Sequence, residues 1–435
     1  MYKVFFMTFG CKVNSYETDA LKSEFASCGF AETHSSEEAD AIIINSCTVT
    51  SSGDSKSLYA VRKMRKAAPN AVIALTGCLP QASPDIAQEL PEADIITGTK
   101  NRKSLPRLVK TALEEQRRIV SVTDYSPHEV FEMMNYKGSQ DKTRAFVKIQ
   151  DGCNQFCSYC IIPYARGRLR SKPINVLRSE IAELAASGHK EIVLVGINLA
   201  FYGIEYGLRL VDAVEICCAQ EGIQRVRLGS LEPEMISDDD LRRLSELSEF
   251  CPQFHLSLQS GCDRTLKAMN RKYTSDKYYE LVQNIHRRFP EAALTTDIMV
   301  GFPTETEEDF TESIRFAEKV GFAKIHVFQY SPRRGTPAAD LPQLPKSVKE
   351  ERAERMKSLA ERLHQNHLRS LIGKEVPVLF ERENEPEFHR GYSPDYTLIK
   401  ISRKNPEKSL RNQIRRVIIE EDRQGFCLGS IIDEN

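Results

Sequence analysis

Long apolar runs are absent from this 435-residue sequence. No stretch approaches the roughly 20 apolar residues that a membrane-spanning helix needs. The N-terminal stretch MYKVFFMTFGCKVNSYETDA has neither a sustained apolar core nor a small-residue cleavage site, which excludes a typical secretory signal. The sequence therefore predicts a soluble protein of the cytoplasm.

Net charge and low-complexity segments are also lacking. The chain has 60 Lys and Arg residues against 61 Asp and Glu residues, for a formal net charge of -1. Without a global electrostatic field, any contact with nucleic acid must come from a local basic patch. The chain is too long for one ordinary core, so its length predicts two or three domains.

Cysteine, by contrast, is plentiful, with 12 residues. A reducing cytoplasm keeps thiols free, so these residues are not expected to pair as structural disulfides. Clustered cysteines in such a protein indicate metal binding or catalysis instead. Cysteine spacing is therefore the most informative feature of the sequence.

The first unit, residues 1–125, alternates short apolar runs with helical patterns, which predicts a doubly wound parallel sheet. Cys11, Cys47 and Cys78 each follow one of three successive strands. Crossover connections place the carboxyl ends of parallel strands along one edge, where ligands usually bind. A single cysteine there more often fills a core, but repetition after three strands favours a shared site.

A polar stretch, residues 124–142, reads as a linker into a second unit, residues 140–370. Six strand candidates alternating with helices predict a partial or full β/α barrel, whose functional loops follow the strands. Beyond a charged helix, residues 371–435 contain short strands without comparable helices, which predicts a small β-barrel. The expected class is α/β throughout the first two units.

The loop after the first strand of the second unit contains Cys153, Cys157 and Cys160, a CxxxCxxC spacing. Structural zinc needs four closed ligands, and no fourth Cys or His lies nearby in the sequence. An iron-sulfur cubane held by three thiolates leaves one iron open for chemistry. In this context the spacing resembles the radical S-adenosylmethionine (SAM) superfamily.

The remaining motifs narrow this resemblance to the methylthiotransferases over essentially the whole chain. They are TFGCKVNSYET, NSCTVT, TGC, DGCNQFCSYCIIPYARGRLRS, LGSLEPE, LQSGCDRTLKAMNRKY, DIMVGFPTET and HVFQYSPRRGTPAA. GCKVN and IIPYARGR are most similar to the branch that acts on N6-threonylcarbamoyladenosine (t6A) beside the tRNA anticodon. The isopentenyladenosine branch more often shows a GCQMN-like version.

The resemblance implies two 4Fe-4S clusters and SAM. One cluster would be held by Cys153, Cys157 and Cys160 and would cleave SAM, so that hydrogen is removed from C2 of the adenine ring. The other, held by Cys11, Cys47 and Cys78, would supply the sulfur. The resemblance also implies a C-terminal TRAM domain, a tRNA partner, and an electron donor of the flavodoxin or ferredoxin type; we expect a monomer.

SAM-binding residues are predicted from polarity and placement after barrel strands. They are Tyr159, Asn198, Glu232, Gln259 and Arg271. Each has an ordinary structural alternative. Asn198 could cap a helix, Glu232 could satisfy a turn, and Arg271 could be a solvated helix charge.

Two basic segments are candidate RNA contacts. Arg166, Arg168 and Arg170 alternate, so in an extended segment they would project to one side and suit phosphate binding. The tail adds a second set, in which we expect phosphate contacts from Lys400, Arg403, Lys404, Arg411, Arg415 and Arg416. For both segments, a solvated surface is the alternative.

Three other functions compete with t6A methylthiolation. The same chemistry could act on isopentenyladenosine tRNA or on an aspartate of a ribosomal protein. A more distant alternative is an iron-sulfur or zinc RNA-binding protein without catalysis. The basic tail and the GCKVN motif favour t6A in tRNA.

Overall fold

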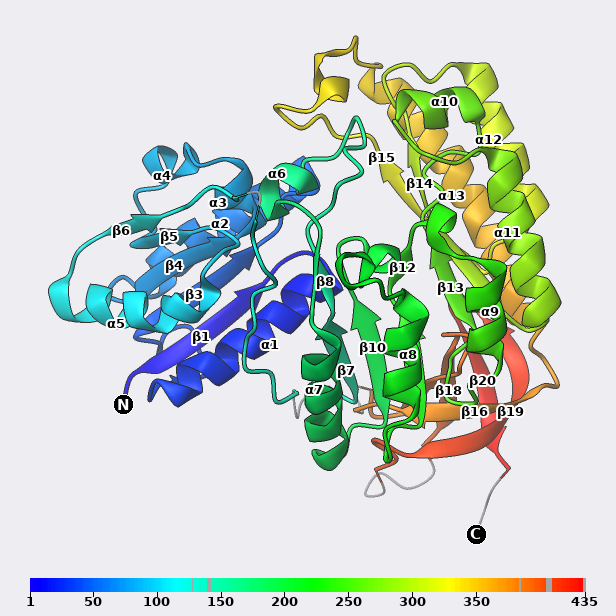
Figure 1. Cartoon of the computed structure of the whole chain (residues 1–435), viewed down its shortest axis with the longest axis horizontal. Helices are drawn as coiled ribbons and strands as arrows, with labels where there is room; N and C mark the ends of the chain where they lie inside the picture. Colours follow the sequence, from blue (N-terminus) through cyan, green and yellow to red (C-terminus); the bar gives the residue numbers. More distant parts are fainter. Residues whose placement is uncertain (127, 139–141, 383–384, 404–408, 433–435) are drawn as a thin grey trace.

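The computed structural model describes residues 1–126, 128–138, 142–382, 385–403 and 409–432. Three architectural parts follow one another along the chain (Figure 1). A parallel sheet formed by the first 121 residues is followed by a larger α/β part, and a closed β-barrel lies near the C-terminus. The α/β class predicted from the sequence is confirmed.

The N-terminal part is a six-stranded parallel sheet in the order β2-β1-β3-β4-β5-β6. Helices cover both of its faces, because α1 and α5 share one apolar core with the sheet and α2 and α4 share the other. The strands are β1 (Lys3–Thr8), β2 (Ala31–Glu32), β3 (Ala41–Ser46), β4 (Val72–Gly77), β5 (Ile95–Thr97) and β6 (Ile119–Ser121). The helices are α1 (Lys12–Ser27), α2 (Ser51–Ala67), α3 (Cys78–Ala82), α4 (Ile86–Glu89) and α5 (Leu105–Glu115).

The central part is the open, partial form of the predicted barrel. Its strands run parallel in the order β7-β10-β11 and β12-β13-β14-β15, and Gly229 separates β11 from β12. They are β7 (Arg144–Lys148), β10 (Glu191–Val195), β11 (Arg225–Leu228), β12 (Ser230–Leu231), β13 (Gln253–Leu256), β14 (Ala293–Val300) and β15 (Lys324–Gln329). Outer helices are α7 (Ile174–Ala186), α8 (Leu210–Cys218), α9 (Asp238–Ser245), α10 (Asp263–Ala268), α11 (Ser275–Arg288) and α12 (Glu307–Val320).

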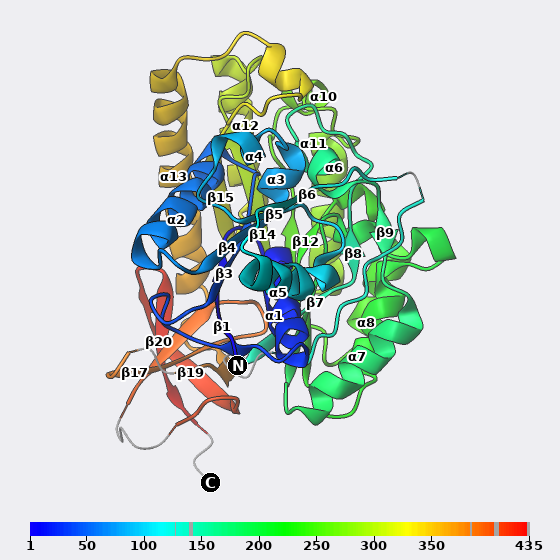
Figure 2. The same cartoon turned by 90° about the vertical axis from the view of Figure 1, so that its left-hand side faces the viewer.

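One long connection after β7 holds the cysteine-rich loop. It comprises the short strands β8 (Gln150–Asp151) and β9 (Arg170–Ser171), which pair antiparallel, and the one-turn helix α6 (Ile162–Arg166) between them. The carbonyl oxygen of Ala165 in α6 accepts a hydrogen bond from the Thr99 hydroxyl at 2.6 Å. This connection therefore lies against the N-terminal part, as Figure 2 also shows for α6 beside α3.

Helix α13 (Lys346–Arg369) leads into the five-stranded closed barrel, ordered β16-β17-β18-β20-β19. Its strands are β16 (Glu375–Phe380), β17 (Phe388–Tyr392), β18 (Leu398–Ser402), β19 (Ile414–Arg423) and β20 (Phe426–Ile431). Arg225 and Arg227 of the central sheet donate to backbone carbonyls of Tyr392 and Pro394, at 2.8 and 2.7 Å. The barrel is thereby fixed to the central strands. No helix in the described ranges has the length and apolarity that spanning a membrane requires.

The barrel depends on a close approach between β16 and β17. A Cβ atom added at Gly391 would lie 2.4 Å from the carbonyl oxygen of Leu379, which is a backbone atom and cannot move aside. We expect Gly391→Ala to lower the free energy of opening this strand pair by about 1–3 kcal/mol. Amide hydrogen exchange in β16 and β17 measures it.

Gly53→Ala is the control for this substitution. Gly53 lies within helix α2, and a Cβ atom added there would lie 3.5 Å from the nearest atom, Oγ1 of Thr50. Alanine at this position should therefore leave the stability of the protein unchanged or raise it slightly. Unchanged exchange in β16 and β17 of Gly391→Ala would contradict the prediction.

Candidate functional site

Three adjacent parallel strands bring Cys11, Cys47 and Cys78 to one edge of the N-terminal sheet. Cys11 precedes α1, Cys47 directly follows β3, and Cys78 begins α3 directly after β4. Gly10 has a φ of +102°, and a Cβ there would lie 2.9 Å from Sγ of Cys47, so glycine permits this approach. Cys11 and Cys47 both act electrostatically on Cys78. The three cysteines therefore lie at one edge of the sheet.

The second group, Cys153, Cys157 and Cys160, lies in the loop between β8 and α6. Nδ2 of Asn198 and the backbone N–H of Gln155 donate to Sγ of Cys153, at 3.5 and 3.4 Å. Nη1 of Arg271 donates to Sγ of Cys157 at 3.4 Å. Sulfurs that accept several N–H groups are typical of cluster-ligating thiolates, whose potential such hydrogen bonds tune.

The thiols fit an iron-sulfur cluster better than a single metal ion. Among the described residues, no three Cys, His, Asp or Glu side chains converge tightly enough to hold one ion. Cysteines of a cubane bind different irons, so they surround a larger volume and need not meet at one point.

Burial keeps the thiols of Cys78 and Cys160 protonated in the absence of a cation. It raises the pKa of Cys78 to about 11, although the nearby Arg166 guanidinium lowers it in part. Burial likewise raises the pKa of Cys160 to about 12. Because metal ligands must be thiolates, binding of iron would release protons from both sites.

A buried network of charges joins the two groups of cysteines. Arg166 is fully buried and donates from Nε to Sγ of Cys78 at 3.3 Å. Its Nη1 donates to Oε1 of Glu17 at 2.7 Å and to Oδ1 of Asp151 at 3.3 Å. Asp151 lies two residues before Cys153, so one guanidinium contacts both halves of the site.

Further basic side chains surround the two carboxylates of this network. Arg102 and Lys148 form ion pairs with Glu17 at 3.0 and 2.8 Å, and Lys148 also pairs with Asp151 at 3.1 Å. Burial by itself raises the pKa of Glu17, but Arg102, Arg166 and Lys148 outweigh it and lower the pKa to about 2. The surplus of positive charge beside Cys78 suits an anionic cluster.

The prediction that Arg166, Arg168 and Arg170 form an exposed row is wrong. Arg166 ends helix α6 and Arg170 lies in β9, so the segment is not uniformly extended. Both side chains point inward, where Arg170 pairs with Asp151 at 3.2 Å and its guanidinium lies over the Tyr125 ring. Only Arg168 is exposed. The buried carboxylates need partners, because unpaired buried charge is too costly, and this draws the other two arginines away from solvent.

The five residues predicted to bind SAM all lie near the second group of cysteines. Asn198 and Arg271 hydrogen-bond to its sulfurs, and Glu232 forms an ion pair with Arg271. Tyr159 and Gln259 line a cavity of about 180 Å³. Gln259 adopts a left-handed conformation with a φ of +66°.

This smaller cavity lies between the two halves of the site. Cys160 lines one side of it, and Val49 and Thr50, which closely follow Cys47 in the chain, line another. Asp297 on β14 lines the same cavity and also a larger one, of about 590 Å³, which Cys11 lines. Asp297 therefore lines both cavities, one of which Cys160 also lines and the other Cys11.

The larger cavity extends from Cys11 through the interior of the central part to the C-terminal barrel. Lys12 lines it, and burial lowers the pKa of this lysine. His255 pairs with Asp297 at 3.2 Å, and His367 pairs with Asp395 at 3.2 Å. The C-terminal barrel thus forms part of the wall of an internal polar space.

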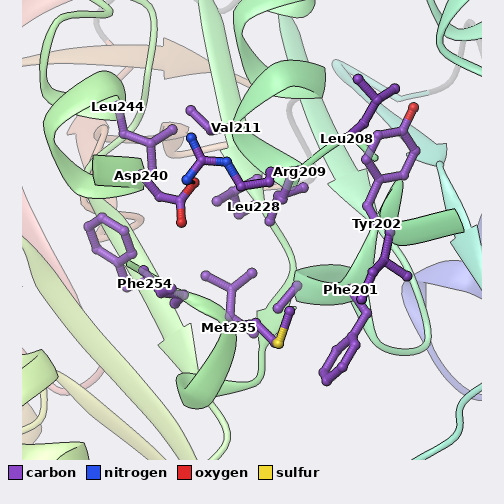
Figure 3. A pocket seen from close by; sticks show the side chains of 15 residues that line it. Phe201, Tyr202, Leu208, Arg209, Val211, Leu228, Met235, Asp240, Leu244 and Phe254 are labelled. Atoms are coloured by element: carbon purple, nitrogen blue, oxygen red, sulfur yellow. Dashed lines mark ion pairs between the residues drawn. The ribbon is translucent and has the colours of Figure 1, made fainter. Parts of the chain in front are cut away.

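A third, apolar cavity of about 110 Å³ lies away from the cysteines, beside α8 and α9 (Figure 3). Phe201, Met235 and Phe254 point into it, and its polar groups Arg209 and Asp240 form an ion pair with each other at 3.2 Å. With its charges satisfied internally, this cavity offers no chemistry to the site.

The basic tail residues occupy different environments. Lys400 is half-buried and paired with Glu385 at 2.7 Å, and Arg416 forms an ion pair with Glu375 on the neighbouring strand. Arg415 donates to Gln413, while Arg403 and Arg411 are partly exposed. Lys404 lies outside the described residues.

Sequence reasoning missed Asp297, Lys12 and the partners of Arg166. Asp297 lies at an inward position of β14, and a carboxylate beside apolar residues of a strand could have been recognised from the sequence as a candidate functional residue. Lys12 carries no signal beyond its place in the GCKVN motif. The pairing of Arg166 with Glu17 joins positions 149 residues apart, for which the sequence carries no local signal.

Two family models match the chain. Residues 147–317 match the radical SAM superfamily, and residues 3–98 match the uncharacterized protein family UPF0004. The second match covers the strands that carry Cys11, Cys47 and Cys78, and the first covers the loop with the other three cysteines.

Curated relatives align over nearly the whole chain. The chain is 36% identical to the threonylcarbamoyladenosine tRNA methylthiotransferase MtaB of Bacillus subtilis (strain 168), over 91% of this chain and 89% of the relative. The protein of that name from Aquifex aeolicus (strain VF5) is 36% identical, over 88% and 93%. The tRNA-2-methylthio-N(6)-dimethylallyladenosine synthase of Caldicellulosiruptor saccharolyticus is also 36% identical, over 86% and 81%.

Solved structures resemble the chain in fold. The radical SAM methyltransferase TsrM from Kitasatospora setae superposes with a TM-score of 0.59 at 14% identity, covering 78% of this chain and 77% of that one. The cobalamin-dependent SAM radical enzyme OxsB gives a TM-score of 0.51 at 11% identity, over 83% and 56%. At these identities the likeness shows the arrangement of strands and helices alone.

The buried network makes a prediction about stability. Glu17→Gln would leave Arg102, Lys148 and Arg166 short of a buried carboxylate, and we expect the free energy of unfolding of the apoprotein to fall by about 3–5 kcal/mol. The pKa of Glu17 is lowered from 4.5 to about 2, so its contribution is present above pH 4.5 and is lost as the pH falls toward 2. The difference in free energy of unfolding between wild type and Glu17→Gln should therefore become smaller as the pH falls below 4.5.

Urea unfolding monitored by circular dichroism between pH 7 and pH 3 measures this difference in free energy of unfolding. Glu318→Gln is the matched control, because Glu318 forms a half-exposed pair with Arg362 and should lose little stability. A pH-independent difference for Glu17→Gln would contradict the assigned ionisation.

Proposed function

The chain belongs to the radical SAM methylthiotransferase family, and we propose that it converts t6A next to the tRNA anticodon into its 2-methylthio derivative. Membership of the radical SAM superfamily implies a 4Fe-4S cluster and SAM. The observation that carries the proposal is the placement of two separate trios of cysteines around one region, with Arg166 in contact with both halves. Neither an electron carrier nor a zinc-stabilised RNA-binding protein needs two separate trios of cysteines of this kind.

In this proposal each trio holds one 4Fe-4S cluster. Cys153, Cys157 and Cys160 would bind the cluster that, with SAM, supplies the radical chemistry at C2 of the adenine. Cys11, Cys47 and Cys78 would bind the cluster that supplies sulfur. The protein's own contribution is positional, since N–H donors from Asn198, Gln155 and Arg271 orient the sulfurs of the first trio.

The smaller cavity is the proposed SAM site. Tyr159 offers an apolar wall, and Gln259 and Asp297 offer hydrogen-bonding groups beside Cys160. Its position next to Val49 and Thr50 places SAM close to the sulfur-donating trio.

The substrate assignment rests on sequence detail in addition to overall similarity. Relatives named for t6A and for dimethylallyladenosine are equally similar, each at 36% identity. GCKVN, with Lys12 at the cavity that Cys11 lines, favours t6A, because that modification carries a carboxylate and a dimethylallyl group does not. Mass spectrometry of tRNA nucleosides from a deletion strain tests this, since loss of 2-methylthio-t6A supports it and loss of only the dimethylallyl derivative overturns it.

The remaining parts of the proposal concern the binding partners, the oligomeric state and the cellular location of the enzyme. The five-stranded barrel would be a TRAM-like domain that binds the tRNA. The enzyme would act as a monomer in the cytoplasm and receive electrons from a protein of the flavodoxin or ferredoxin type. Unmodified tRNA together with an altered aspartate on a ribosomal protein would favour the alternative substrate.

Iron content separates the two clusters. Reconstituted wild-type protein should contain about eight irons per chain, and Cys78→Ala should retain about four, because only the sulfur-donating trio is broken. SAM cleavage should persist in this variant while methylthiolation of tRNA is lost. Iron and sulfide assays under argon, with product analysis, measure both.

Cys28→Ala provides the matched control for this experiment. Cys28 is an exposed thiol at the end of α1, outside both trios, and its loss should leave iron content and product unchanged. Methylthiolation by Cys78→Ala at the wild-type rate would refute the assignment of the donor cluster.

The barrel arginines generate a prediction about RNA binding. Reversing the charge of Arg411, Arg415 and Arg416 should weaken binding of tRNA at moderate salt and flatten its salt dependence, by roughly 0.9 in logarithmic slope for each phosphate that is no longer bound. Reversal of Arg242 and Arg362, exposed arginines of α9 and α13, is the control. Unchanged tRNA affinity of the barrel variant between 50 and 200 mM salt would exclude these contacts.

A further inference from the structure

The larger cavity joins all three parts of the chain. Cys11 and Lys12 line it from the N-terminal part, Asp297 and Lys324 from the central sheet, and Asp395 and Tyr396 from the C-terminal barrel. Its volume of about 590 Å³ falls within the range of small-molecule sites. It also adjoins the proposed SAM cavity through Asp297.

In the wall of the cavity the acidic side chains have ion-pair partners, whereas two lysines have no carboxylate partner among the described residues. Both acids are engaged, because Asp297 pairs with His255 and Asp395 pairs with His367. Among the residues that the structure describes, no carboxylate forms an ion pair with Lys12 or Lys324, and both lie close enough to His326 to act on it electrostatically. Two exposed ammonium groups, neither paired with a carboxylate in the described part of the chain, therefore line one cavity.

Lys12 lies beside the C-terminal barrel. Its Nζ lies 5.5 Å from the ring centre of Tyr396 in the C-terminal barrel, and Arg144 and Arg227 add positive potential from behind. Lys12 is exposed, and it lines the cavity next to Cys11. An ammonium in this position, without a carboxylate partner in the described part of the chain, can pair with an anionic group that enters the cavity.

We propose that Lys12, assisted by Lys324, binds the carboxylate of the threonylcarbamoyl group and so selects t6A over uncharged adenosine modifications. This inference rests on the proposed function and assigns its substrate specificity to named residues. The modified base must come within reach of the sulfur-donating trio, and Lys12 directly follows Cys11 of that trio. A carboxylate that pairs with the ammonium holds the adenine beside the cysteines.

A phosphate of the RNA backbone is the other anion that could meet this charge. The cavity is partly open to solvent, lies among side chains of three parts of the chain, and contains in its wall the two acids named above. A single carboxylate on a flexible substituent can enter such a space, whereas the backbone would have to bring several charges with it. We therefore assign the site to the substituent.

The test uses anticodon stem-loops that contain t6A or its neutral carboxamide analogue, which differ only in the charge of one group. With reconstituted wild-type enzyme, we expect kcat/KM and affinity to favour the acid by about 10- to 100-fold, as for other buried charge pairs. Lys12→Gln should reduce this preference to about threefold or less by weakening the acid alone. Lys12→Arg should retain it.

Lys22→Gln is the matched control, because Lys22 lies on the same helix, pairs with Glu32 at 2.5 Å and does not line the cavity. A Lys12→Gln variant that keeps the wild-type preference for the acid would overturn the proposal. So would an equal loss of affinity for both stem-loops with a shallower salt dependence, since that result would identify a phosphate contact.

Fluorescence anisotropy of the same stem-loops separates this inference from the proposed function. If wild-type enzyme methylthiolated neither stem-loop, the proposed function would fail, and binding would still decide the role of Lys12. A preference for the acid in binding that disappears in Lys12→Gln supports the inference, and equal binding of acid and amide by the wild type rejects it.

Discussion

The buried ion network around Arg166 is the interaction on which the arrangement of this protein depends. Two carboxylates, Glu17 and Asp151, hold basic groups from the N-terminal part and from the central part within one buried region. Charges buried this deeply are stable only with every partner in place. The network therefore fixes the geometry between the two trios of cysteines, since Arg166 contacts Cys78 directly and Asp151 precedes Cys153.

The cavities show why three structural parts are needed for one reaction. The N-terminal part, the cysteine-rich loop and the central strands line the smaller cavity, and the C-terminal barrel lines one side of the larger one. The barrel thus has two roles in our proposal, to bind RNA on its outer surface and to complete an internal wall with Tyr396 and Asp395. Arg225 and Arg227 hold it in place by donating to its backbone carbonyls.

Much of the candidate site could be predicted from the sequence, because the position of a cysteine directly after a strand is a local property of the chain. Cys11, Cys47 and Cys78 each follow a strand, and parallel crossover topology then requires that they share one edge. The CxxxCxxC loop after β7 was readable for the same reason. The row of arginines was misread because alternation predicts a common side only in an extended segment, whereas Arg166 ends a helix and Arg170 belongs to a strand.

The sequence by itself determined the order of strands and helices, the two groups of thiols and the family, because periodicity and spacing act over a few residues. Tertiary structure alone decided that Arg166 is a buried link rather than an RNA contact, and that Lys12 faces an internal cavity. These outcomes depend on which distant side chains come within a few ångströms. Glu17 and Arg166 lie 149 positions apart, and only folding brings their charges together.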